Sequence, residues 1–413
     1  MKIVYLHNYF HIKTGSGTVM FQEAEIMKQN GHEVYFFCTD KKPYYDENYK
    51  YLHYFPKFND FKKMSKKEKI LNLLTPFYNK EAVKKFGMFL DEVKPDLVHE
   101  HTISFYLTPA ILNECYKRKI PVISTMHGPG YFCPAGNLLN GKTGEICDKV
   151  LCKGVNKLPC FINKCYEGNI FRQIYETILR YHYVENFLKK ADYFICPSNA
   201  LRDIALTSGY PQEKVFTVYN CLQEEIKRKE PGNSEYFLYT GRIDKGKGIY
   251  NLIEAWRKLP REIPLHIVGT GKEKENAQKI IEQYSLDNVK LLGFKTGEEL
   301  DREYQNCIAT ILPPIYFEVF GMTILEAFRY SKPVIGSKTG GIPEVIDDGI
   351  NGILYKRNDL EALKDAVLKL YHNRQLAEEY GRKGNEKLKA IFSAQEHYNK
   401  LIEVYKKAVK NQL

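Results

Sequence analysis

Two carboxylates lie on either side of an expected helix start in the segment Phe317-Glu318-Val319-Phe320-Gly321-Met322-Thr323-Ile324-Leu325-Glu326-Ala327. We expect the backbone N–H groups of Gly321, Met322 and Thr323 to face an anion, which the helix dipole also favours. Glu318 precedes the helix, and Glu326 lies about one turn inside it. Because a carboxylate repels phosphate, the two are better suited to accept hydrogen bonds from hydroxyls of a ribose and of a second sugar.

Two cations flank a glycine-bearing turn in Gly241-Arg242-Ile243-Asp244-Lys245-Gly246-Lys247-Gly248. Arg242 and Lys247 can converge on one diphosphate, and fixed cations stabilise the charge that a leaving diphosphate gains. Further along, the adjacent glycines Gly340 and Gly341 follow an expected strand and allow a close backbone approach to a ligand. The second half of the chain therefore carries the residues of a phosphate-binding pocket.

Strands and helices alternate through the first half of the chain. The first strand leads into a loop with Gly15 and Gly17, then a helix from about Thr18 to Asn30 that Gly31 caps. This strand–loop–helix unit places a phosphate at a helix N-terminus. Apolar runs predict buried parallel strands at Ile3–Leu6, Glu33–Cys38, Leu97–Glu100, Val122–Met126 and Tyr193–Cys196.

The second half repeats this alternation, with strands expected at Tyr236–Tyr239, Leu265–Val268, Val289–Leu292, Ala309–Leu312, Pro333–Gly336 and Gly352–Tyr355. The pattern predicts an α/β protein with two Rossmann-like, doubly wound parallel-sheet domains that face each other across a cleft. We expect domains at 1–216 and 217–392, a hinge near Thr217–Asn233, and a C-terminal helix at 393–413 that crosses back to the first domain.

Taken in order, the Glu-x7-Glu element, Gly-Arg…Lys-Gly and Gly-Gly-Ile-Pro-Glu resemble the retaining glycosyltransferases of the GT-B fold, specifically glycosyltransferase family 4. The resemblance covers essentially the whole chain. It implies that Glu318 contacts donor-sugar hydroxyls, and Glu326 the nucleoside ribose. It implies that Arg242 and Lys247 clamp the diphosphate, and that backbone at Gly241 and Phe320–Thr323 holds donor sugar and phosphate.

The resemblance reaches two places in the first domain. Gly15-Ser16-Gly17 matches a glycine loop that approaches the diphosphate, although family members often have paired glycines there. His127 matches a histidine near the reacting carbon, which implies a hydrogen bond to the donor sugar and support of an oxocarbenium-like transition state. Glu100 and His101 end another expected strand and are candidates for acceptor binding.

The expected activity is retaining transfer of a hexose-type sugar from a nucleotide-diphosphate sugar to a glycan or lipid-linked hydroxyl, in cell-surface polysaccharide synthesis. Retention is an implication of the resemblance. No Asp-x-Asp triplet occurs, and the helix dipole with Arg242 and Lys247 can neutralise the diphosphate, so we predict catalysis without a metal cofactor.

Ten cysteines suggest a structural metal site, because five of them fall between Cys133 and Cys165. In a reducing compartment, clustered thiolates favour a structural zinc ion on an insertion spanning 133–165, with Cys133, Cys147, Cys152 and Cys165 as ligands. Buried free thiols are the alternative, and disulfides are a third.

The bulk composition narrows the partners and the location. The chain has 413 residues, a hydrophobic content of 44% and a formal net charge of +11. No spanning apolar run and no signal peptide is evident, so we expect a cytoplasmic protein. No nucleic-acid motif accompanies the charge. The lysines between Lys57 and Lys85, interleaved with apolar side chains, fit either a peripheral position on the anionic inner face of a membrane or a solvated helix face.

Three other functions compete with transfer. A Rossmann dehydrogenase would need Gly-x-Gly-x-x-Gly, but Met20 stands where the third glycine belongs. A GT-B sugar-nucleotide epimerase or phosphorylase would share the fold. A non-catalytic sugar-nucleotide-binding partner subunit would have no need of all four charged groups. The donor base and sugar, the acceptor and the oligomeric state are not readable from the sequence.

Overall fold

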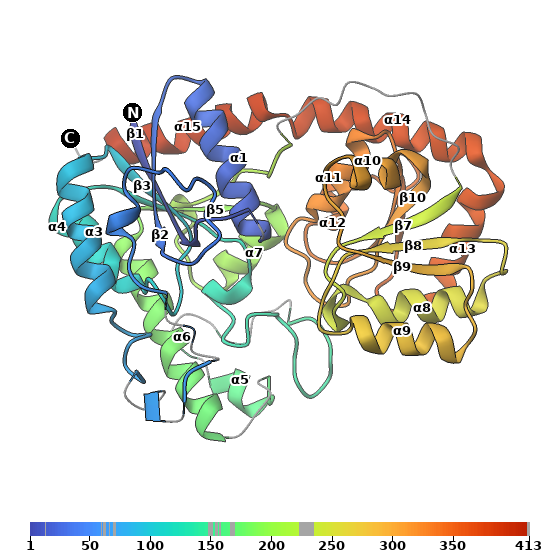
Figure 1. Cartoon of the computed structure of the whole chain (residues 1–413), viewed down its shortest axis with the longest axis horizontal. Helices are drawn as coiled ribbons and strands as arrows, with labels where there is room; N and C mark the ends of the chain where they lie inside the picture. Colours follow the sequence, from blue (N-terminus) through green and yellow to red (C-terminus); the bar gives the residue numbers. More distant parts are fainter. Residues whose placement is uncertain are drawn as a thin grey trace. The chain divides into compact units, whose positions relative to one another are not determined.

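The computed structural model describes residues 1–12, 14–58, 60, 63–65, 67–68, 72–147, 152, 156, 158–165, 170–222 and 235–410. The chain forms two compact units (Figure 1). Unit 1 joins Met1–Tyr219 to His397–Leu413, and unit 2 spans Asn220–Glu396. The sequence placed these joins near 217 and 393. Most of the hinge expected at Thr217–Asn233 lies outside the described residues.

Unit 1 contains a six-stranded sheet with the order β2-β1-β3-β4-β5-β6, and its strands pair in parallel. The strands are β1 (Lys2–Tyr9), β2 (Glu33–Thr39), β3 (Leu97–Thr102), β4 (Val122–Thr125), β5 (Tyr193–Cys196) and β6 (Val215–Thr217). Its helices are α1 (Gly15–Gln29), η1 (Leu52–Tyr54), α3 (Lys80–Val93), η2 (Pro109–Ile111), α4 (Leu112–Lys117), η3 (Pro129–Tyr131), α5 (Leu158–Ile162), α6 (Ile170–Lys190), α7 (Asn199–Thr207) and η4 (Gln212–Lys214).

Unit 2 contains a second six-stranded parallel sheet, with the order β12-β11-β10-β7-β8-β9. The strands are β7 (Tyr236–Thr240), β8 (Leu265–Val268), β9 (Val289–Gly293), β10 (Cys307–Leu312), β11 (Val334–Ser337) and β12 (Gly352–Tyr355). Its helices are η5 (Lys245–Lys247), α8 (Ile249–Lys258), α9 (Lys274–Gln283), α10 (Gly297–Asn306), α11 (Met322–Arg329), α12 (Ile342–Val345), α13 (Leu360–His372) and α14 (Arg374–Ile391).

The two parallel α/β units confirm the predicted fold class. Three strands, β5, β8 and β12, begin and end at the predicted residues, and the other predicted strands differ by one to three residues at an end. Strand β6 was missed because it is only three residues long and follows the polar segment Gln212–Lys214. Helix α1 begins at Gly15, earlier than predicted, because the side chain of Thr14 caps it by accepting a hydrogen bond from the N–H of Gly17 at 3.1 Å.

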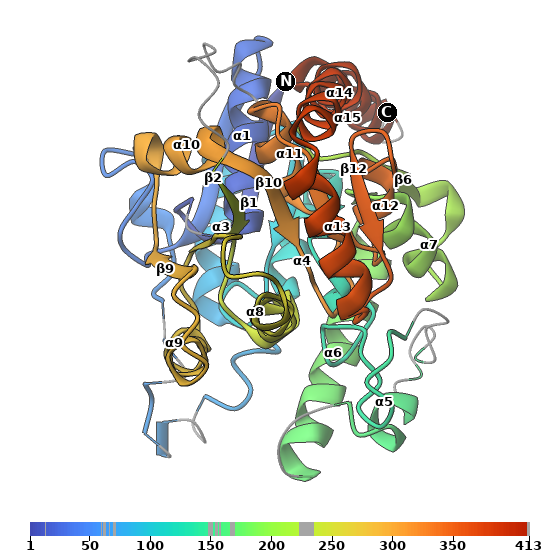
Figure 2. The same ribbon diagram turned by 90° about the vertical axis from the view of Figure 1, so that its right-hand side faces the viewer.

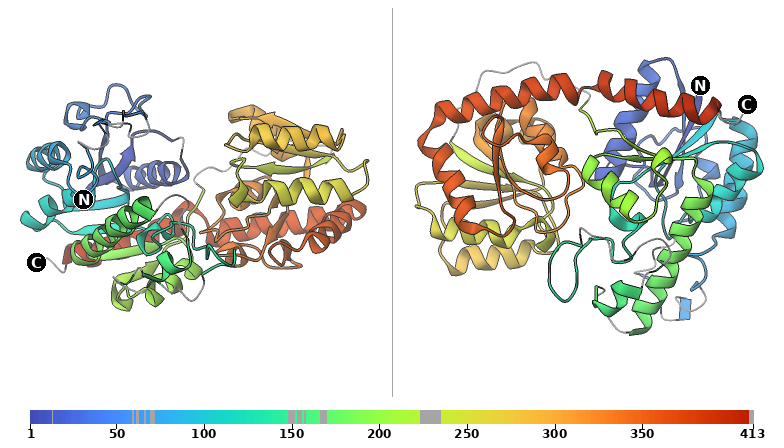
Figure 3. Two further views of the ribbon diagram at one scale, coloured as in Figure 1. Left: turned by 90° about the horizontal axis from the view of Figure 1, so that it is seen from below. Right: turned by 180° about the vertical axis from the view of Figure 1, so that it is seen from behind.

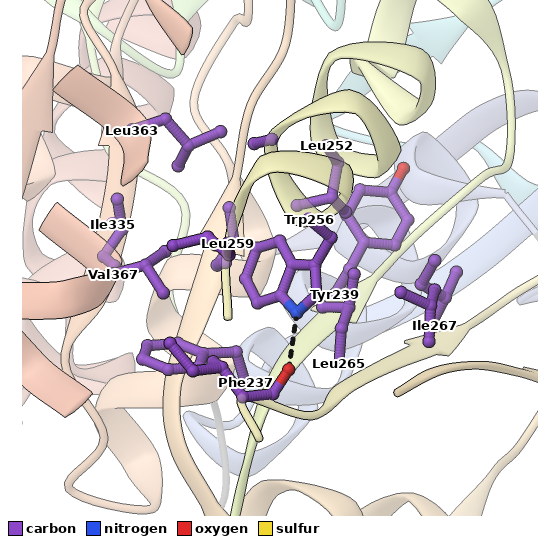
Figure 4. Close-up of a cluster of buried hydrophobic side chains, with 14 of the residues drawn as sticks. Phe237, Tyr239, Leu252, Trp256, Leu259, Leu265, Ile267, Ile335, Leu363 and Val367 are labelled. Atoms are coloured by element: carbon purple, nitrogen blue, oxygen red, sulfur yellow. Dashed lines mark hydrogen bonds between the residues drawn. The ribbon is translucent and has the colours of Figure 1, made fainter. Parts of the chain in front are cut away.

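The core of unit 2 is built around Trp256, the single tryptophan of the chain (Figure 4). The indole of Trp256 is fully buried and donates a hydrogen bond to the carbonyl of Ile263 at 3.0 Å. Helix α8 lies beside α13 and α9, as Figure 2 shows, so these helices cover one face of the sheet. Their apolar side chains therefore anchor the strands whose ends carry the candidate site.

Two glycines of α14 set the position of α11. A Cβ at Gly381 would lie 1.8 Å from the carbonyl oxygen of Ser331, and one at Gly384 would lie 2.3 Å from the ring of Phe328. Both contacts are far below van der Waals distance, so only glycine allows this close packing. The C-terminal end of α11 is therefore packed closely against α14.

Unit 1 is completed by the last helix, α15 (Ala394–Lys410), which lies beside α1 (Figures 1 and 3). Tyr405 is fully buried, and its hydroxyl lies 3.1 Å from that of Tyr5 on β1. Within the described ranges, none of the helices is both long enough and apolar enough to cross a lipid bilayer.

Candidate functional site

The glycine-bearing turn after β7 packs directly against the loop that carries Glu318. Asp244 shapes the turn, because its carboxylate accepts a hydrogen bond from the N–H of Lys247 at 2.9 Å. Gly248 has φ +76°, and a Cβ there would lie 1.8 Å from the carbonyl oxygen of Pro313. A Cβ at Gly246 would overlap the ring of Tyr316. These two glycines bring the cation-bearing turn against residues 313–318.

This packing produces the central pair of the site. The Nζ of Lys247 donates to Oε2 of Glu318 at 2.6 Å, and the side chains are only 20% and 12% exposed. Burial disfavours the charged amine, but the Glu318 carboxylate and the Tyr316 hydroxyl outweigh it and raise the pKa of Lys247. Lys247 therefore stays a cation at neutral pH, held for an incoming anion.

Helix α11 begins beside this pair with its first N–H groups open. Gly321 adopts φ +88° at the N-cap, and no side chain caps the helix. In the part of the chain that the structure describes, no acceptor bonds the N–H groups of Gly321, Met322 and Thr323. The structure thus contains the expected combination of open amides and a nearby cation, which favours anion binding.

Glu326 is held in place one turn into the helix. Its Oε2 accepts a hydrogen bond from the hydroxyl of Tyr304 at 2.6 Å, and that hydroxyl also lies 2.7 Å from Oγ1 of Thr240 at the end of β7. Burial raises the pKa of Glu326, with the Tyr304 hydrogen bond opposing it. The carboxylate is therefore anchored close to Gly241, the residue after Thr240.

Arg242 is the most exposed of the predicted groups. Its side chain is 70% exposed and lies 3.1 Å from the carboxylate of Asp244. The positive charge of Arg242 also acts on the Tyr316 hydroxyl, which contacts Lys247. Arg242 and Lys247 therefore lie on the same turn and approach the same tyrosine.

The paired glycines after β11 pack against the loop that carries Glu318. Gly340 has φ +54°, and a Cβ there would lie 1.8 Å from the carbonyl oxygen of Glu318. The N–H of Gly341 donates to the same oxygen at 2.8 Å. The close backbone approach is therefore made to the Glu318 loop, which these glycines hold in place.

In unit 1, Gly15 and Gly17 lie in the first turn of α1. The position of a Cβ on Gly17 is blocked by the carbonyl oxygen of His11 at 2.6 Å, whereas nothing lies within 4 Å of the corresponding position on Gly15. Ser16 between them has its hydroxyl 3.0 Å from Nε2 of His7. The Gly15 side of this helix end is therefore open, while Gly17 is required by packing.

His127 follows β4 and is half-buried. Its Nε2 lies 2.8 Å from Nδ1 of His101, whose Nε2 lies 3.3 Å from Oε1 of Glu23 on α1. Burial and the neighbouring His101 lower the pKa of His127. Burial and His99 likewise lower the pKa of His101 to about 4. Both rings are therefore neutral at neutral pH.

Glu23, His99 and His101 are the one group among the described residues whose ligand atoms lie close enough to hold a metal, within 4.8 Å of one another. These atoms already have partners. Nδ1 and Nε2 of His99 lie 2.6 Å from the Tyr405 hydroxyl and 2.7 Å from the Thr125 hydroxyl, respectively. We therefore interpret the group as a hydrogen-bonded network.

Burial argues against the suggestion that Glu100 and His101 bind the acceptor. Both side chains are fully buried. Glu100 accepts hydrogen bonds from the N–H of Ile103 at 2.8 Å and from the Tyr131 hydroxyl at 3.1 Å. Burial raises the pKa of Glu100 to about 7. Neither side chain offers surface to an acceptor here, because both point into the interior from within β3.

The cysteine segment is described only in part, since residues 148–151, 153–155 and 157 lie outside the described set. All ten cysteines lie in the described residues, and none is in a disulfide. Cys160, which the predicted ligand set omits, lies in hydrogen-bonding contact with Cys152 and Cys165 and close to Cys133. Cys147 is held in a turn by its N–H, which donates to the carbonyl of Leu138 at 2.6 Å.

Sequence reasoning missed three residues of these clusters, Tyr316, Tyr304 and Glu23, and it left Cys160 out of the ligand set although Cys160 lies within the cysteine cluster. Tyr316 lies two residues before Glu318, and that proximity was the available signal. Tyr304 and Glu23 sit within helical patterns that give no sign of their contacts, because their partners lie on other elements.

Two family models match this chain. The model described as Glycosyltransferase Family 4 matches residues 13–225, and the model described as Glycosyl transferases group 1 matches residues 223–387. The first match covers unit 1 up to the join, and the second covers most of unit 2.

Several curated proteins are similar in sequence. An uncharacterized glycosyltransferase of Methanocaldococcus jannaschii is 30% identical over 42% of this chain, and the match spans about half of that protein, 49%. Alpha-monoglucosyldiacylglycerol synthase of Acholeplasma laidlawii is 26% identical over 72% of this chain and 71% of its own. The O-antigen chain mannosyltransferase C of Escherichia coli is 24% identical over 58% of this chain and 67% of its own.

Solved structures share the fold over nearly the whole chain. Sucrose-phosphate synthase from Thermosynechococcus elongatus superposes with a TM-score of 0.71 at 17% identity, covering 99% of each chain. Anabaena HepE, solved with UDP-glucose, superposes with a TM-score of 0.69 at 17% identity, covering 98% of this chain and 100% of its own. With the two family matches and the two parallel α/β units, these similarities show that the chain belongs to the glycosyltransferases of the GT-B fold.

Proposed function

We propose that the chain is a retaining, family 4 hexosyltransferase, which moves a sugar from a nucleotide-diphosphate donor to a hydroxyl of a glycan or lipid-linked acceptor. The observation that carries the proposal is the 2.6 Å pair of Lys247 and Glu318 beside the open amides of α11. The names of relatives that build an O-antigen chain and a glycolipid support a role in cell-surface polysaccharide or glycolipid synthesis.

In this proposal, unit 2 holds the donor. The N–H groups of Gly321–Thr323 and the cations Arg242 and Lys247 bind the diphosphate and stabilise the charge that it gains as the glycosidic bond breaks. Glu318 accepts a hydrogen bond from the transferred sugar, and Glu326 from the ribose. His127 contacts the donor sugar, as the resemblance to family 4 implies. An epimerase or a silent partner subunit is less well supported, because neither requires this full set of charged groups.

Replacing Lys247 by Met tests the proposed phosphate clamp. We expect transfer from UDP-glucose or GDP-mannose to fall by about 10²–10³-fold, because a fixed cation on the leaving group is lost. Glu318→Gln should give a similar fall by weakening the grip on the sugar. The matched control is Lys245→Met, an exposed lysine on the same turn. Equal activity of Lys247→Met and Lys245→Met in a product assay would refute the clamp.

The stereochemistry and the metal requirement test the rest of the reaction. We expect the product to keep the anomeric configuration of the donor, read by the coupling of the anomeric proton in NMR. We also expect the rate to be unchanged by EDTA, since protein cations and helix amides neutralise the diphosphate. An inverted product, or activity restored only by Mg²⁺ or Mn²⁺, would contradict the assignment. Donor consumption without any acceptor would favour an epimerase.

We propose that an anionic membrane surface carries the acceptor, at the cytoplasmic face. The surface that supports this lies on α6, where Ile170, Phe171, Ile174, Ile178 and Tyr181 are all exposed. Because successive helical residues turn by about 100°, these five side chains form one stripe. The buried side chains of α6 lie on another side of the helix and are Leu179, Tyr183, Val184 and Phe187.

Neighbouring segments extend this apolar stripe. Helix α5 lies beside α6 (Figures 1 and 2) and exposes Leu158 and Ile162. The segment 72–78 is tied to α6 by the Tyr175 hydroxyl, which donates to the carbonyl of Leu73 at 3.0 Å. That segment exposes Leu73, Leu74 and Tyr78.

The positive charge around the apolar stripe indicates that the stripe binds an anionic lipid surface. Residues 57–85 contain nine lysines against three acidic residues, and the described Lys63, Lys67 and Lys80 are exposed. Apolar side chains beside clustered lysines are the combination that binds anionic bilayers. Part of this stretch, 59, 61–62, 66 and 69–71, lies outside the described residues.

Vesicle flotation tests the surface. We expect the protein to float with phosphatidylglycerol-containing vesicles and not with pure phosphatidylcholine. The double variant Phe171→Gln, Ile178→Gln should lose about tenfold in binding, because about 1.4 kcal/mol of apolar transfer energy disappears. The control is Phe294→Gln, which removes a similarly exposed phenylalanine, 72%, from unit 2. Unchanged flotation of the double variant, or a dimer in sedimentation that the variant abolishes, would overturn the lipid assignment.

We further propose that thiolates of the 133–165 segment hold a structural zinc ion, with Cys160 in place of Cys147 among the predicted ligands. The support is Cys160, which lies in hydrogen-bonding contact with Cys152 and with Cys165 and close to Cys133, so that one zinc ion would draw together four thiolates, the usual set for a structural site. Elemental analysis of the purified chain should find one zinc per protein. Cys160→Ser should lose it, and Cys115→Ala, a buried thiol of α4, should keep it. Wild-type protein without zinc would remove the proposal.

A further inference from the structure

Glu23 is a buried carboxylate that is connected to His127 through one intervening residue, His101. It has no role in the proposed reaction. Glu23 is 3% exposed and is surrounded by nitrogen and hydroxyl groups. Its Oε1 lies 2.8 Å from Nδ1 of His99, 3.3 Å from Nε2 of His101 and 3.2 Å from the Tyr405 hydroxyl. Burial alone would raise the pKa of Glu23, but His99 and His101 outweigh it and hold the pKa well below its usual value. Glu23 is therefore an ionised acceptor.

An ionised Glu23 determines which nitrogen of His101 carries the proton. A carboxylate without a proton can only accept, so Nε2 of His101 must be the N–H that points to it. Because His101 is neutral at neutral pH, its Nδ1 then has a lone pair and no proton. The ring is also fixed by packing, with its centroid 4.2 Å from that of His99 and 5.5 Å from that of Tyr5.

The same reasoning determines which nitrogen of His127 carries the proton. Nδ1 of His101 lies 2.8 Å from Nε2 of His127, and one hydrogen must lie between two nitrogens at that distance. Since His101 can only accept there, Nε2 of His127 donates. A neutral His127 then has a bare Nδ1, so the ring offers an acceptor and no second donor.

Helix α15 holds Glu23, the residue at which this series of hydrogen bonds begins. Nε2 of His397 lies 3.3 Å from Oε2 of Glu23, and Nδ1 of His397 lies 2.7 Å from the carbonyl oxygen of Tyr219. With Tyr405, the C-terminal helix thus contacts both oxygens of the carboxylate. Glu23 has little freedom to turn away from His101.

We propose that Glu23, acting through His101, fixes His127 as the tautomer protonated on Nε2, so that its Nδ1 accepts a hydrogen bond from a hydroxyl of the donor sugar. Glu23 and His101 are positioning residues in this arrangement, and His127 is the residue that meets the ligand. The proposal rests on the proposed function for its ligand. The tautomer itself follows from the hydrogen-bond geometry of unit 1.

The tautomer can be measured directly. In long-range ¹H–¹⁵N spectra of the full chain labelled with ¹⁵N-histidine, the His127 signals are identified by their loss in His127→Gln. We expect wild-type His127 to be protonated on Nε2. In Glu23→Gln, the amide group can donate to His101, and we expect the His127 proton to move to Nδ1 or to divide between the two nitrogens.

Two further variants keep the test decisive. Glu100→Gln is the matched control, because Glu100 is another buried carboxyl, next to His101 on β3, and contacts Ser124 and Tyr131 instead. It should leave the His127 tautomer unchanged. If Glu23→Gln does not fold, His101→Phe keeps a ring at that position and removes both nitrogens, and it should give mixed tautomers. Wild-type His127 protonated on Nδ1, or a tautomer unmoved in Glu23→Gln or His101→Phe, overturns the proposal.

Calorimetric titration separates this proposal from the proposed function. Glu23→Gln should weaken binding of the matching sugar nucleotide, UDP-glucose or GDP-mannose, by about tenfold, since one hydrogen bond to the sugar is lost. It should leave binding of UDP or GDP unchanged. Equal weakening of nucleotide and sugar nucleotide would indicate general damage and would overturn the positioning role. Wild-type protein that binds none of these ligands would contradict the proposed function, while the NMR result would still decide the tautomer.

Discussion

The buried carboxylate of Glu23 is the constraint on which unit 1 depends. A charged group removed from water costs several kcal/mol unless donors surround it. Here the groups that surround it come from two elements that are distant in sequence, β3 and α15. Satisfying one carboxylate therefore holds the first helix, the centre of the sheet and the last helix of the chain together.

Unit 2 depends on backbone packing instead of a buried charge, because close contact between loops forms its candidate site. Gly248 approaches the carbonyl of Pro313, and Gly340 approaches the carbonyl of Glu318, each at distances that no side chain would allow. These contacts bring Lys247 and Glu318 together although 71 positions separate them in sequence. The charged pair is thus a consequence of backbone packing, and the glycines contribute to the site by allowing that packing.

Local patterns predicted the strands well because buried parallel strands are short apolar runs between turns. Tyr193–Cys196 and Leu265–Val268 illustrate this, since both match the structure at each end. The start of α1 was misplaced because Thr14, outside the expected helix, caps it. The motifs also pointed to Glu318, Lys247 and the open start of α11. Those residues lie at turns and helix ends, which have recognisable residue patterns in a sequence.

Contacts between elements that are distant in sequence could not be predicted from local sequence patterns. Nothing in the pattern around Glu23 distinguishes it from a solvated helix residue, and its burial is decided by His99, His101 and Tyr405. The same holds for Tyr304, whose hydroxyl meets Glu326, and for Cys160, which meets Cys152 and Cys165. These residues depend on tertiary structure, which a single sequence does not display.

The division of unit 1 between the two ends of the chain has a consequence for biosynthesis. Residues 1–219 leave the ribosome before unit 2, but the helix that contacts both oxygens of Glu23 is made after unit 2. Until it emerges, the nascent sheet exposes the hydroxyl of Tyr5 and a carboxylate that lacks His397 and Tyr405. Unit 2 can fold during that interval as an uninterrupted segment. Unit 1 is therefore completed only after unit 2 has been synthesised, and a ribosome that stops within unit 2 releases a chain whose first domain is unfinished.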